Sequence, residues 1–132
     1  MRVFILEDSA PRMVWFHQSF IGCQLDWAFT VEQGIKLLEK NEYDVIFLDH
    51  DLCDAHYMYI LEGKELTTEL LATTGRTVAR WIGEHPEKST GAHIVLHSMN
   101  NAGCLVMQSY LKGRKVDIVP YDQLKKRLKV PR

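Results

Sequence analysis

The residues best suited to chemistry are an acid, an imidazole and an acid in succession, Asp49, His50 and Asp51. They directly follow the apolar run 45–48, in which apolar and polar positions do not alternate. Such a run is typical of a central strand in a parallel sheet that helices cover on both faces. Sheets of this kind carry their functional residues just beyond the carboxyl ends of the strands, where these three side chains would emerge. The alternative interpretation is a polar turn after a core strand.

A second apolar run, residues 3–6, also ends in two acids, Glu7 and Asp8. If the two strand ends lie side by side, three or four carboxylates share one pocket, and a cation or raised pKa values must offset their repulsion. A divalent metal held by Glu7, Asp8 and Asp49 is the simplest prediction, with Glu7 acting through water. Oxygen ligands favour Mg²⁺, whereas an imidazole ligand would favour Mn²⁺ or Zn²⁺. We therefore expect Mg²⁺ or Mn²⁺.

A third apolar run, residues 94–96, is followed by His97 and Ser98. Asn100 or Asn101 then caps a helix, and the free amides at the start of that helix would attract a phosphate group. We expect Ser98, Asn100 and Asn101 to contact the phosphate of a substrate. Metal on one side and amides on the other would then hold a phosphoester.

The two histidines beside the acids titrate near neutral pH, so His97 and His50 could share the general base and general acid roles, each typically worth ~10² to 10⁴-fold in rate. We expect Asp49, His97 and His50 to be catalytic, with His97 as the main group. Asp51 joins the substrate-binding group, where it would orient His50 or reach the metal through water. Two alternatives stay open. His97 could cap a neighbouring helix, and His50 could point to the other side of the sheet, since strand residues alternate sides.

Five repeats of a strand followed by a helix position these groups. This alternation predicts an α/β fold, a doubly wound parallel sheet with helices on both faces. Right-handed crossovers and the flavodoxin-like strand order 2-1-3-4-5 would put Asp8 and Asp49 on either side of the point where the winding reverses. The expected strands are 2–6, 25–29 near the sheet edge, 44–48, 93–98 and 116–119.

The helices are predicted from their caps and their apolar spacing. The first begins near Pro11 and ends at Gly22, Thr30 and Gln33 form the capping box of the second, and Asp122 caps the last. The apolar residues expected along these helices are Met13, Phe16, Phe20 and Ile21 in the first, Val31, Ile35 and Leu38 in the second, Val78, Trp81 and Ile82 in the third, Ala102, Leu105, Val106 and Tyr110 in the fourth, and Leu124 and Leu128 in the last.

Residues 52–75 form an insertion after the third strand, because connections in such folds usually take only a handful of residues. Within it, residues 65–71 could form a short helix with Leu66 and Leu70 facing inward. A long connection that begins beside an acidic pocket suits a lid or a substrate-selecting wall. Padding at the edge of the sheet is the alternative.

The chain has 132 residues and a formal net charge of −1, which predicts one domain and no extended nucleic-acid surface. Cys23, Cys53 and Cys104 suit neither a zinc site nor a disulfide framework, so we expect free thiols. The first apolar run is too short for a signal peptide and no stretch could span a bilayer. We therefore expect a soluble cytoplasmic protein with no membrane partner, whose partner is a small phosphoester or an RNA-end substrate. A homodimer is left open.

Essentially the whole chain resembles the receiver domains of two-component response regulators. The resemblance rests on Glu7 and Asp8 after the first strand, Asp49 after the third, and a polar residue after the fourth. It implies that the first acidic pair and the central aspartate hold Mg²⁺ and that the central aspartate accepts a phosphoryl group. It also implies a Thr or Ser after the fourth strand.

The chain departs from the receiver pattern at two positions. His97 stands at the hydroxyl position, and Val119 precedes Pro120 where receivers have a lysine that senses the phosphoryl group. A domain without that lysine cannot relay aspartyl phosphorylation in the usual way. The segments 48–52 and 97–100 are similar to those of the receiver-like group named cyclic-phosphate-processing receiver domains. This resemblance implies an activity on cyclic phosphates.

Three functions follow from these observations. The first is a metal-dependent phosphodiesterase that hydrolyses a cyclic phosphate, such as a 2′,3′-cyclic phosphate at an RNA end or on a nucleotide. The second is a receiver or pseudo-receiver signalling module, which the retained Asp8 and Asp49 favour. The third is a structural domain that only binds a partner, and it predicts no affinity for metal.

Overall fold

Five parallel strands form one sheet in the order β2-β1-β3-β4-β5, as predicted. The structure is a computed structural model, and it describes residues 1–52, 62–63 and 72–127. The strands are β1 (Arg2–Leu6), β2 (Gln24–Ala28), β3 (Val45–Leu48), β4 (His93–Leu96) and β5 (Lys115–Ile118). β4 ends earlier than the predicted strand 93–98, so His97 and Ser98 lie beyond it. This is the flavodoxin-like fold expected from the sequence.

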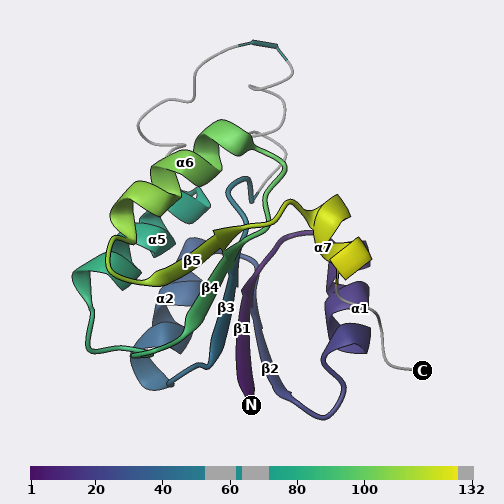
Figure 1. The fold of residues 1–132 in the computed structure, drawn as a ribbon, viewed down its shortest axis with the longest axis horizontal. Helices are drawn as coiled ribbons and strands as arrows, with labels where there is room; N and C mark the ends of the chain where they lie inside the picture. Colours follow the sequence, from purple (N-terminus) through teal and green to yellow (C-terminus); the bar gives the residue numbers. More distant parts are fainter. Residues whose placement is uncertain (53–61, 64–71, 128–132) are drawn as a thin grey trace.

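Helices cover both faces of the sheet, as Figure 1 shows. The helices are α1 (Ala10–Ser19), α2 (Val31–Lys40), α5 (Gly75–Glu84), α6 (Asn101–Tyr110) and α7 (Tyr121–Arg127). α2, α5 and α6 lie on one face, while α1 and α7 lie on the other. We call these the α5–α6 side and the α1–α7 side. Within the described ranges, no helix combines the length and the apolar character needed to cross a membrane.

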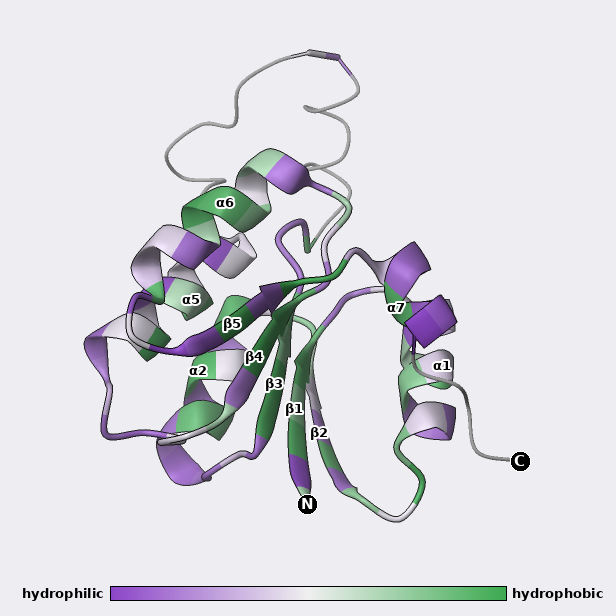
Figure 2. Ribbon diagram, in the orientation of Figure 1, coloured by the Kyte–Doolittle hydropathy of each residue, from purple (hydrophilic) through white to green (hydrophobic). Residues whose placement is uncertain are grey.

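The core is divided by the sheet into two apolar clusters. Phe4 and Leu6 of β1 pack into the cluster on the α5–α6 side, whereas Val3 and Ile5 pack on the α1–α7 side. Successive strand residues therefore face opposite helices, as the two-residue period of a strand requires. Burial of both faces explains the unbroken apolar runs of the inner strands, which Figure 2 colours as hydrophobic. The same alternation decides which side each polar residue after a strand will face.

Side chains cap four of the five helices in the described part of the chain. Ser9, Thr30, Thr74 and Asn100 each accept a backbone N–H in the first turn, and for Asn100 the donor is Gly103 at 2.9 Å. Asn100 rather than Asn101 is thus the cap of α6. The predicted Asp122 cap is wrong.

The last helix begins one residue before Asp122. The carbonyl of Pro120 accepts the N–H groups of both Gln123 and Leu124, so Asp122 lies inside the first turn of α7. Proline is favoured at a helix start because its φ angle is already close to the helical value. An acid in that turn still suits the helix dipole.

Two predicted apolar faces are wrong in part. α1 ends at Ser19, before Gly22, because the backbone leaves the helical conformation at Phe20, and Gly22 takes a φ of +90° in the turn that leads into β2. Ile21 is consequently 72% exposed. In α6 the buried residues are Gly103, Cys104 and Met107, while Leu105 and Tyr110 are exposed.

The ends of the insertion are fixed to the end of β3. Leu52 is buried, and the Gly75 N–H donates to the carbonyl of His50 at 2.8 Å. A Cβ atom on Gly75 would lie only 1.9 Å from the Asp49 carbonyl oxygen, so only glycine fits there. The predicted helix 65–71, Cys53 and Leu128 lie outside the described residues.

Candidate metal and phosphate site

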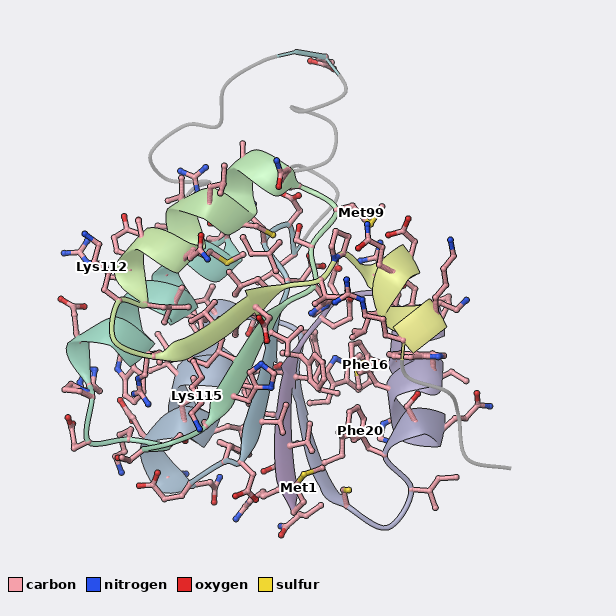
Figure 3. The ribbon with its side chains drawn as sticks, in the orientation of Figure 1. Met1, Phe16, Phe20, Met99, Lys112 and Lys115 are labelled. Carbon is pink, nitrogen blue, oxygen red and sulfur yellow. The ribbon has the colours of Figure 1, made fainter. Side chains whose placement is uncertain are left out.

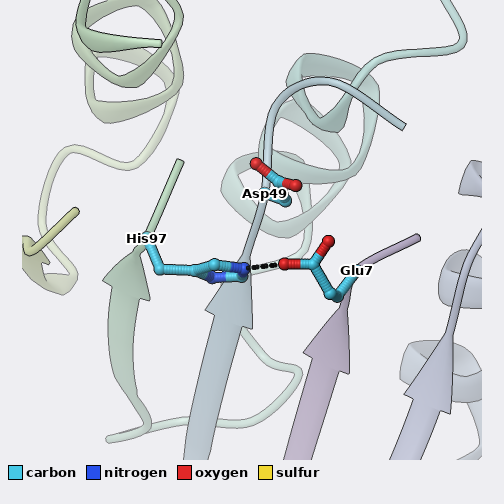
Figure 4. A group of neighbouring side chains, drawn as sticks. All are labelled: Glu7, Asp49 and His97. Carbon is cyan, nitrogen blue, oxygen red and sulfur yellow. Dashed lines mark hydrogen bonds and ion pairs between the residues drawn. The ribbon is translucent and has the colours of Figure 1, made fainter. Parts of the chain in front are cut away.

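Three neighbouring strand ends bring Glu7, Asp49 and His97 together on the α1–α7 side (Figure 4). Leu6 pairs with Leu48, and Leu48 pairs with Leu96, so the residues that follow these positions are neighbours. One potential ligand atom from each of the three side chains lies within 4.8 Å of the others. All three side chains are buried. We call this group the acid–imidazole cluster.

Glu7 is the most heavily hydrogen-bonded member. Its Oε2 accepts the backbone N–H groups of Asp8 at 2.9 Å and Ser9 at 3.1 Å. Its Oε1 lies 3.0 Å from Nε2 of His97 and 3.4 Å from Nη1 of Arg12. Burial would raise the pKa of Glu7, but the hydrogen bond and charge of His97, the Ser9 amide and the Arg12 charge outweigh it and lower the pKa to about 2. Glu7 is therefore a carboxylate at neutral pH.

Asp49 is left short of partners. Its Oδ1 accepts the backbone N–H of His50 at 2.8 Å, while its Oδ2 is 3.8 Å from Nη1 of Arg12. Burial, followed by the negative charge of Glu7, raises the pKa of Asp49 well above its usual value, and Arg12 opposes this rise. A divalent cation would lower the pKa of Asp49 again, because its positive charge favours the ionised carboxylate.

His97 lies under aromatic side chains from α1 and β3. Its ring centre is 5.3 Å from that of Phe16 and 6.2 Å from that of Phe47. Figure 3 shows Phe16 and Phe20 between α1 and the sheet. Burial lowers the pKa of His97, although Glu7 opposes the change, so a neutral imidazole donates Nε2–H to Glu7.

Two polar atoms of this cluster lack a hydrogen bond. Among the residues that the structure describes, Asp49 Oδ2 and His97 Nδ1 are the only buried side-chain nitrogen or oxygen atoms without a hydrogen-bond partner. Buried polar atoms are rarely left in this state unless they serve a ligand. Two carboxylates and an imidazole form a donor set that suits Mn²⁺ or Zn²⁺ better than Mg²⁺. The residues present therefore fit a divalent cation.

Arg12 is a component that the sequence analysis missed. It extends from the first turn of α1 towards Glu7 and Asp49, and its guanidinium lies 4.6 Å from the ring centre of Tyr121. Arg12 brings a positive charge to a site where the lysine of receiver domains is replaced by Val119. The detectable signal was an arginine five residues after the acid, in the first turn of the following helix.

Asp8 does not join the three clustered side chains. It follows Glu7, so its side chain leaves the strand end in another direction and stays partly exposed. Burial and the charge of Glu7 raise the pKa of Asp8 to about 6. The structure thus brings Glu7 to Asp49, where we had expected Asp8 to be the direct neighbour. A metal-binding role for Asp8 stays a prediction.

His50 lies apart from the acid–imidazole cluster, on the α5–α6 side. Nε of Arg76 donates to His50 Nε2 at 2.7 Å, so the proton on Nδ1 is available to Asp51 Oδ1 at 2.9 Å. Gly103 makes room for the ring, since a Cβ atom there would lie 2.5 Å from it. His50 and His97 therefore lie on opposite sides of the sheet. The structure shows the alternative in which His50 points to the other side.

The remaining predicted site residues lie near His50. Nδ2 of Asn100 donates to Asp51 Oδ2 at 3.4 Å. The backbone N–H of Asn100 donates to the hydroxyl of the buried Ser98 at 3.0 Å. Asn101 is exposed at the first position of α6. We call His50, Asp51, Arg76 and Asn100 the histidine network. Phosphate binding by Ser98, Asn100 and Asn101 stays a prediction.

The family of the chain is identified by its sequence. A family model described as "Cyclic-phosphate processing Receiver domain" matches residues 2–113. The chain belongs to this family. The resemblance inferred from the sequence is thereby confirmed, while no curated protein matches the chain in sequence.

Solved structures of response regulators share the fold. The Mn²⁺-bound form of Rcp1 has a TM-score of 0.65 and 14% identity, over 96% of this chain and 85% of its own. A response regulator from Burkholderia pseudomallei with a phosphorylated aspartic acid, calcium ion and citrate has a TM-score of 0.64 and 10% identity, over 97% of this chain and 66% of its own. TrrA from Thermotoga maritima, in complex with Mg²⁺ and BeF, has a TM-score of 0.61 and 19% identity, over 96% and 94%. Identities this low establish the fold alone.

Proposed function

We propose that this protein is a metal-dependent phosphodiesterase that opens a cyclic phosphate on a nucleotide or an RNA end. The observation that carries the proposal is the acid–imidazole cluster, in which Asp49 Oδ2 has no hydrogen-bond partner among the described residues. Membership of the cyclic-phosphate-processing family supports the choice of substrate. Rcp1, which shares the fold, has a Mn²⁺-bound form, and this supports a divalent ion in the present protein.

The side chains of the acid–imidazole cluster would hold the ion and the phosphate. Glu7 and Asp49 supply carboxylate oxygens, and His97 supplies a ring nitrogen. A divalent cation bound there acts as a Lewis acid on the phosphate oxygens. Arg12 is already within 4 Å of both carboxylates, so its guanidinium could bind a nonbridging phosphate oxygen when the ion neutralises them.

The histidine network would supply proton transfer. Asp51 accepts the Nδ1–H of His50. The other ring nitrogen, Nε2, therefore carries a lone pair, and this lone pair accepts the hydrogen bond from Arg76. Release of Arg76 would free Nε2 to accept or return a proton, the general acid–base role expected of His50. Catalytic roles for His97 and His50 are both part of this proposal.

Hydrolysis assays test the proposal directly. Purified protein is incubated with 2′,3′-cyclic nucleotides in the presence of Mg²⁺ or Mn²⁺, and the opened phosphomonoester is measured. We expect turnover that EDTA abolishes and that Asp49→Ala and His97→Ala reduce by about 100-fold or more. Turnover that survives both substitutions, or no turnover with either metal, would refute the activity.

A receiver-like signalling role is the second candidate. It is favoured by the fold shared with response regulators and by Asp49 at the end of β3. The lack of a lysine at Val119 and the burial of Asp49 weigh against it. Incubation with a small phosphodonor separates the two functions, because a stable aspartyl phosphate at Asp49 would favour signalling over hydrolysis.

A further inference from the structure

Two exposed aromatic side chains lie at the end of the edge strand β2. Trp27 is 39% exposed and Phe29 is 49% exposed, and their ring centres are 5.8 Å apart at an interplanar angle of 59°. Large aromatic rings are usually buried more deeply, because they gain the most from leaving water. We call this pair the aromatic shelf.

The aromatic shelf is tied to the acid–imidazole cluster through Glu7. Nε1 of Trp27 donates to the backbone carbonyl of Glu7 at 2.6 Å, which fixes the indole ring relative to this strand end. The N–H of Glu7 in turn donates to the carbonyl of Ala28 at 3.0 Å. The carbonyl and the N–H of the Glu7 backbone thus both bind the end of β2, which holds the aromatic shelf beside the cluster.

Strand alternation puts the aromatic shelf on the same side of the sheet as the cluster. Ala28, between the two rings, packs into the core on the α5–α6 side, so Trp27 and Phe29 extend towards the α1–α7 side. Glu7, Asp49 and His97 face that side too. Only β1 lies between the ends of β2 and β3, and two strand spacings amount to about 10 Å. One nucleotide can extend over that distance.

We propose that Trp27 and Phe29 bind the base of a nucleotide substrate while its cyclic phosphate lies at the acid–imidazole cluster. This inference rests on the proposed function and narrows its substrate to cyclic phosphates that carry a base. The indole ring is held in place before binding, so little side-chain freedom is lost when a base stacks on it. Because every base offers a ring face, the shelf should accept all four bases with similar affinity.

Equilibrium binding and turnover together test this inference. The probes are adenosine 2′,3′-cyclic phosphate and the base-free glycerol 1,2-cyclic phosphate. Binding is measured by calorimetry in EDTA, where no metal-dependent turnover occurs, and kcat/KM is measured in Mn²⁺. The variants are Phe29→Ala, which removes one exposed ring, and Trp27→Phe, which keeps a ring but loses the hydrogen bond to Glu7. Tyr110→Leu removes an exposed ring from α6 and is the matched control.

We expect Phe29→Ala to weaken nucleotide binding by about 10-fold and Trp27→Phe by less, with glycerol 1,2-cyclic phosphate and Tyr110→Leu unaffected. The ratio of kcat/KM for the nucleotide over the base-free probe should fall by the same factor. If Phe29→Ala weakens nucleotide binding but no hydrolysis is seen, the aromatic shelf is supported and the proposed function fails. If the protein hydrolyses the probes but Phe29→Ala leaves the ratio of kcat/KM values unchanged, the aromatic shelf is refuted and the proposed function stands. Undetectable nucleotide binding, or equal losses for both probes, also overturns it.

Discussion

The two sides of the β3 end differ in how completely their polar atoms are paired. In the histidine network, Arg76 binds one nitrogen of His50 and Asp51 binds the other. In the acid–imidazole cluster, one oxygen of Asp49 and one nitrogen of His97 have no hydrogen-bond partner among the described residues. A paired network holds a geometry, whereas an unpaired buried group is costly unless a ligand completes it. The comparison indicates that ligand binding should affect the α1–α7 side first.

Metal addition should separate the two sides most clearly. Mn²⁺ at about 100 times its dissociation constant should raise the free energy of unfolding by about 2.7 kcal/mol, because only the folded protein offers the site. We expect this gain to be lost in Asp49→Asn and retained in Asp51→Asn, the matched acid on the other side. Thermal unfolding with and without Mn²⁺ measures it. Equal losses in the two variants would mean that the difference between the sides does not determine metal binding.

Substitution of Gly103 should damage the histidine network alone. The added Cβ of Gly103→Ala would lie 2.5 Å from the buried ring of His50, so the ring or α6 must shift, at a cost of about 2 kcal/mol. Gly34→Ala in α2 is the control, since its closest contact is 3.3 Å to the side chain of Phe4. Urea unfolding gives both values. Mn²⁺ should still stabilise Gly103→Ala, and loss of that stabilisation would show that the two sides are coupled.

Removal of the Asp49 charge should stabilise the metal-free protein at neutral pH. The pKa of Asp49 is raised in the folded protein, so the folded state binds its proton more tightly. Stability is therefore lost as pH rises from the unfolded value of about 4 towards the raised value. Asp49→Asn escapes this loss and should be more stable than wild type at pH 7.5, with no advantage at pH 3.5. Urea unfolding of wild type and Asp49→Asn at the two pH values measures the difference.

Arg12 should compete weakly with the metal. Its guanidinium lies near the same two carboxylates, so Arg12→Met should increase the affinity for Mn²⁺ several-fold, or by about 1 kcal/mol. Calorimetric titration measures the change, and Arg76→Met in the histidine network should leave the affinity unchanged. Weaker Mn²⁺ binding to Arg12→Met would mean that Arg12 supports the ion instead of competing with it.

The sequence predicted the five strands because apolar runs are patterns local in the chain, and the strand order followed from the flavodoxin-like fold that their alternation with helices favours. Apolar runs that close in acids are visible directly, and so is the regular alternation of strand and helix. The acid that would reach Asp49 was not visible, because Glu7 and Asp8 are adjacent and only the register of β1 against β3 chooses between them. For the same reason the sequence left the direction of His50 open.

The contacts of Arg12, Arg76 and Gly103 could not be predicted from the sequence for a different reason. Arg12 and Arg76 reach the two sites from helices, and nothing local indicates where a flexible side chain will end. Gly103 looked like an ordinary helix residue, yet the ring of His50 determines that position from 53 residues away in the chain. Such contacts depend on the assembled core, not on local pattern.

The alternation along β3 has a consequence for how this protein can change. Asp49 and His50 differ by one position in the chain and face opposite helical layers, so a single inserted or deleted codon within residues 45–48 would reverse the layer that each of them faces. After a deletion, His50 would take the place of Asp49 beside Glu7, and the carboxylate of Asp51 would take the place of His50 beside Gly103 and Arg76. Length changes in this strand can therefore be accommodated only two residues at a time.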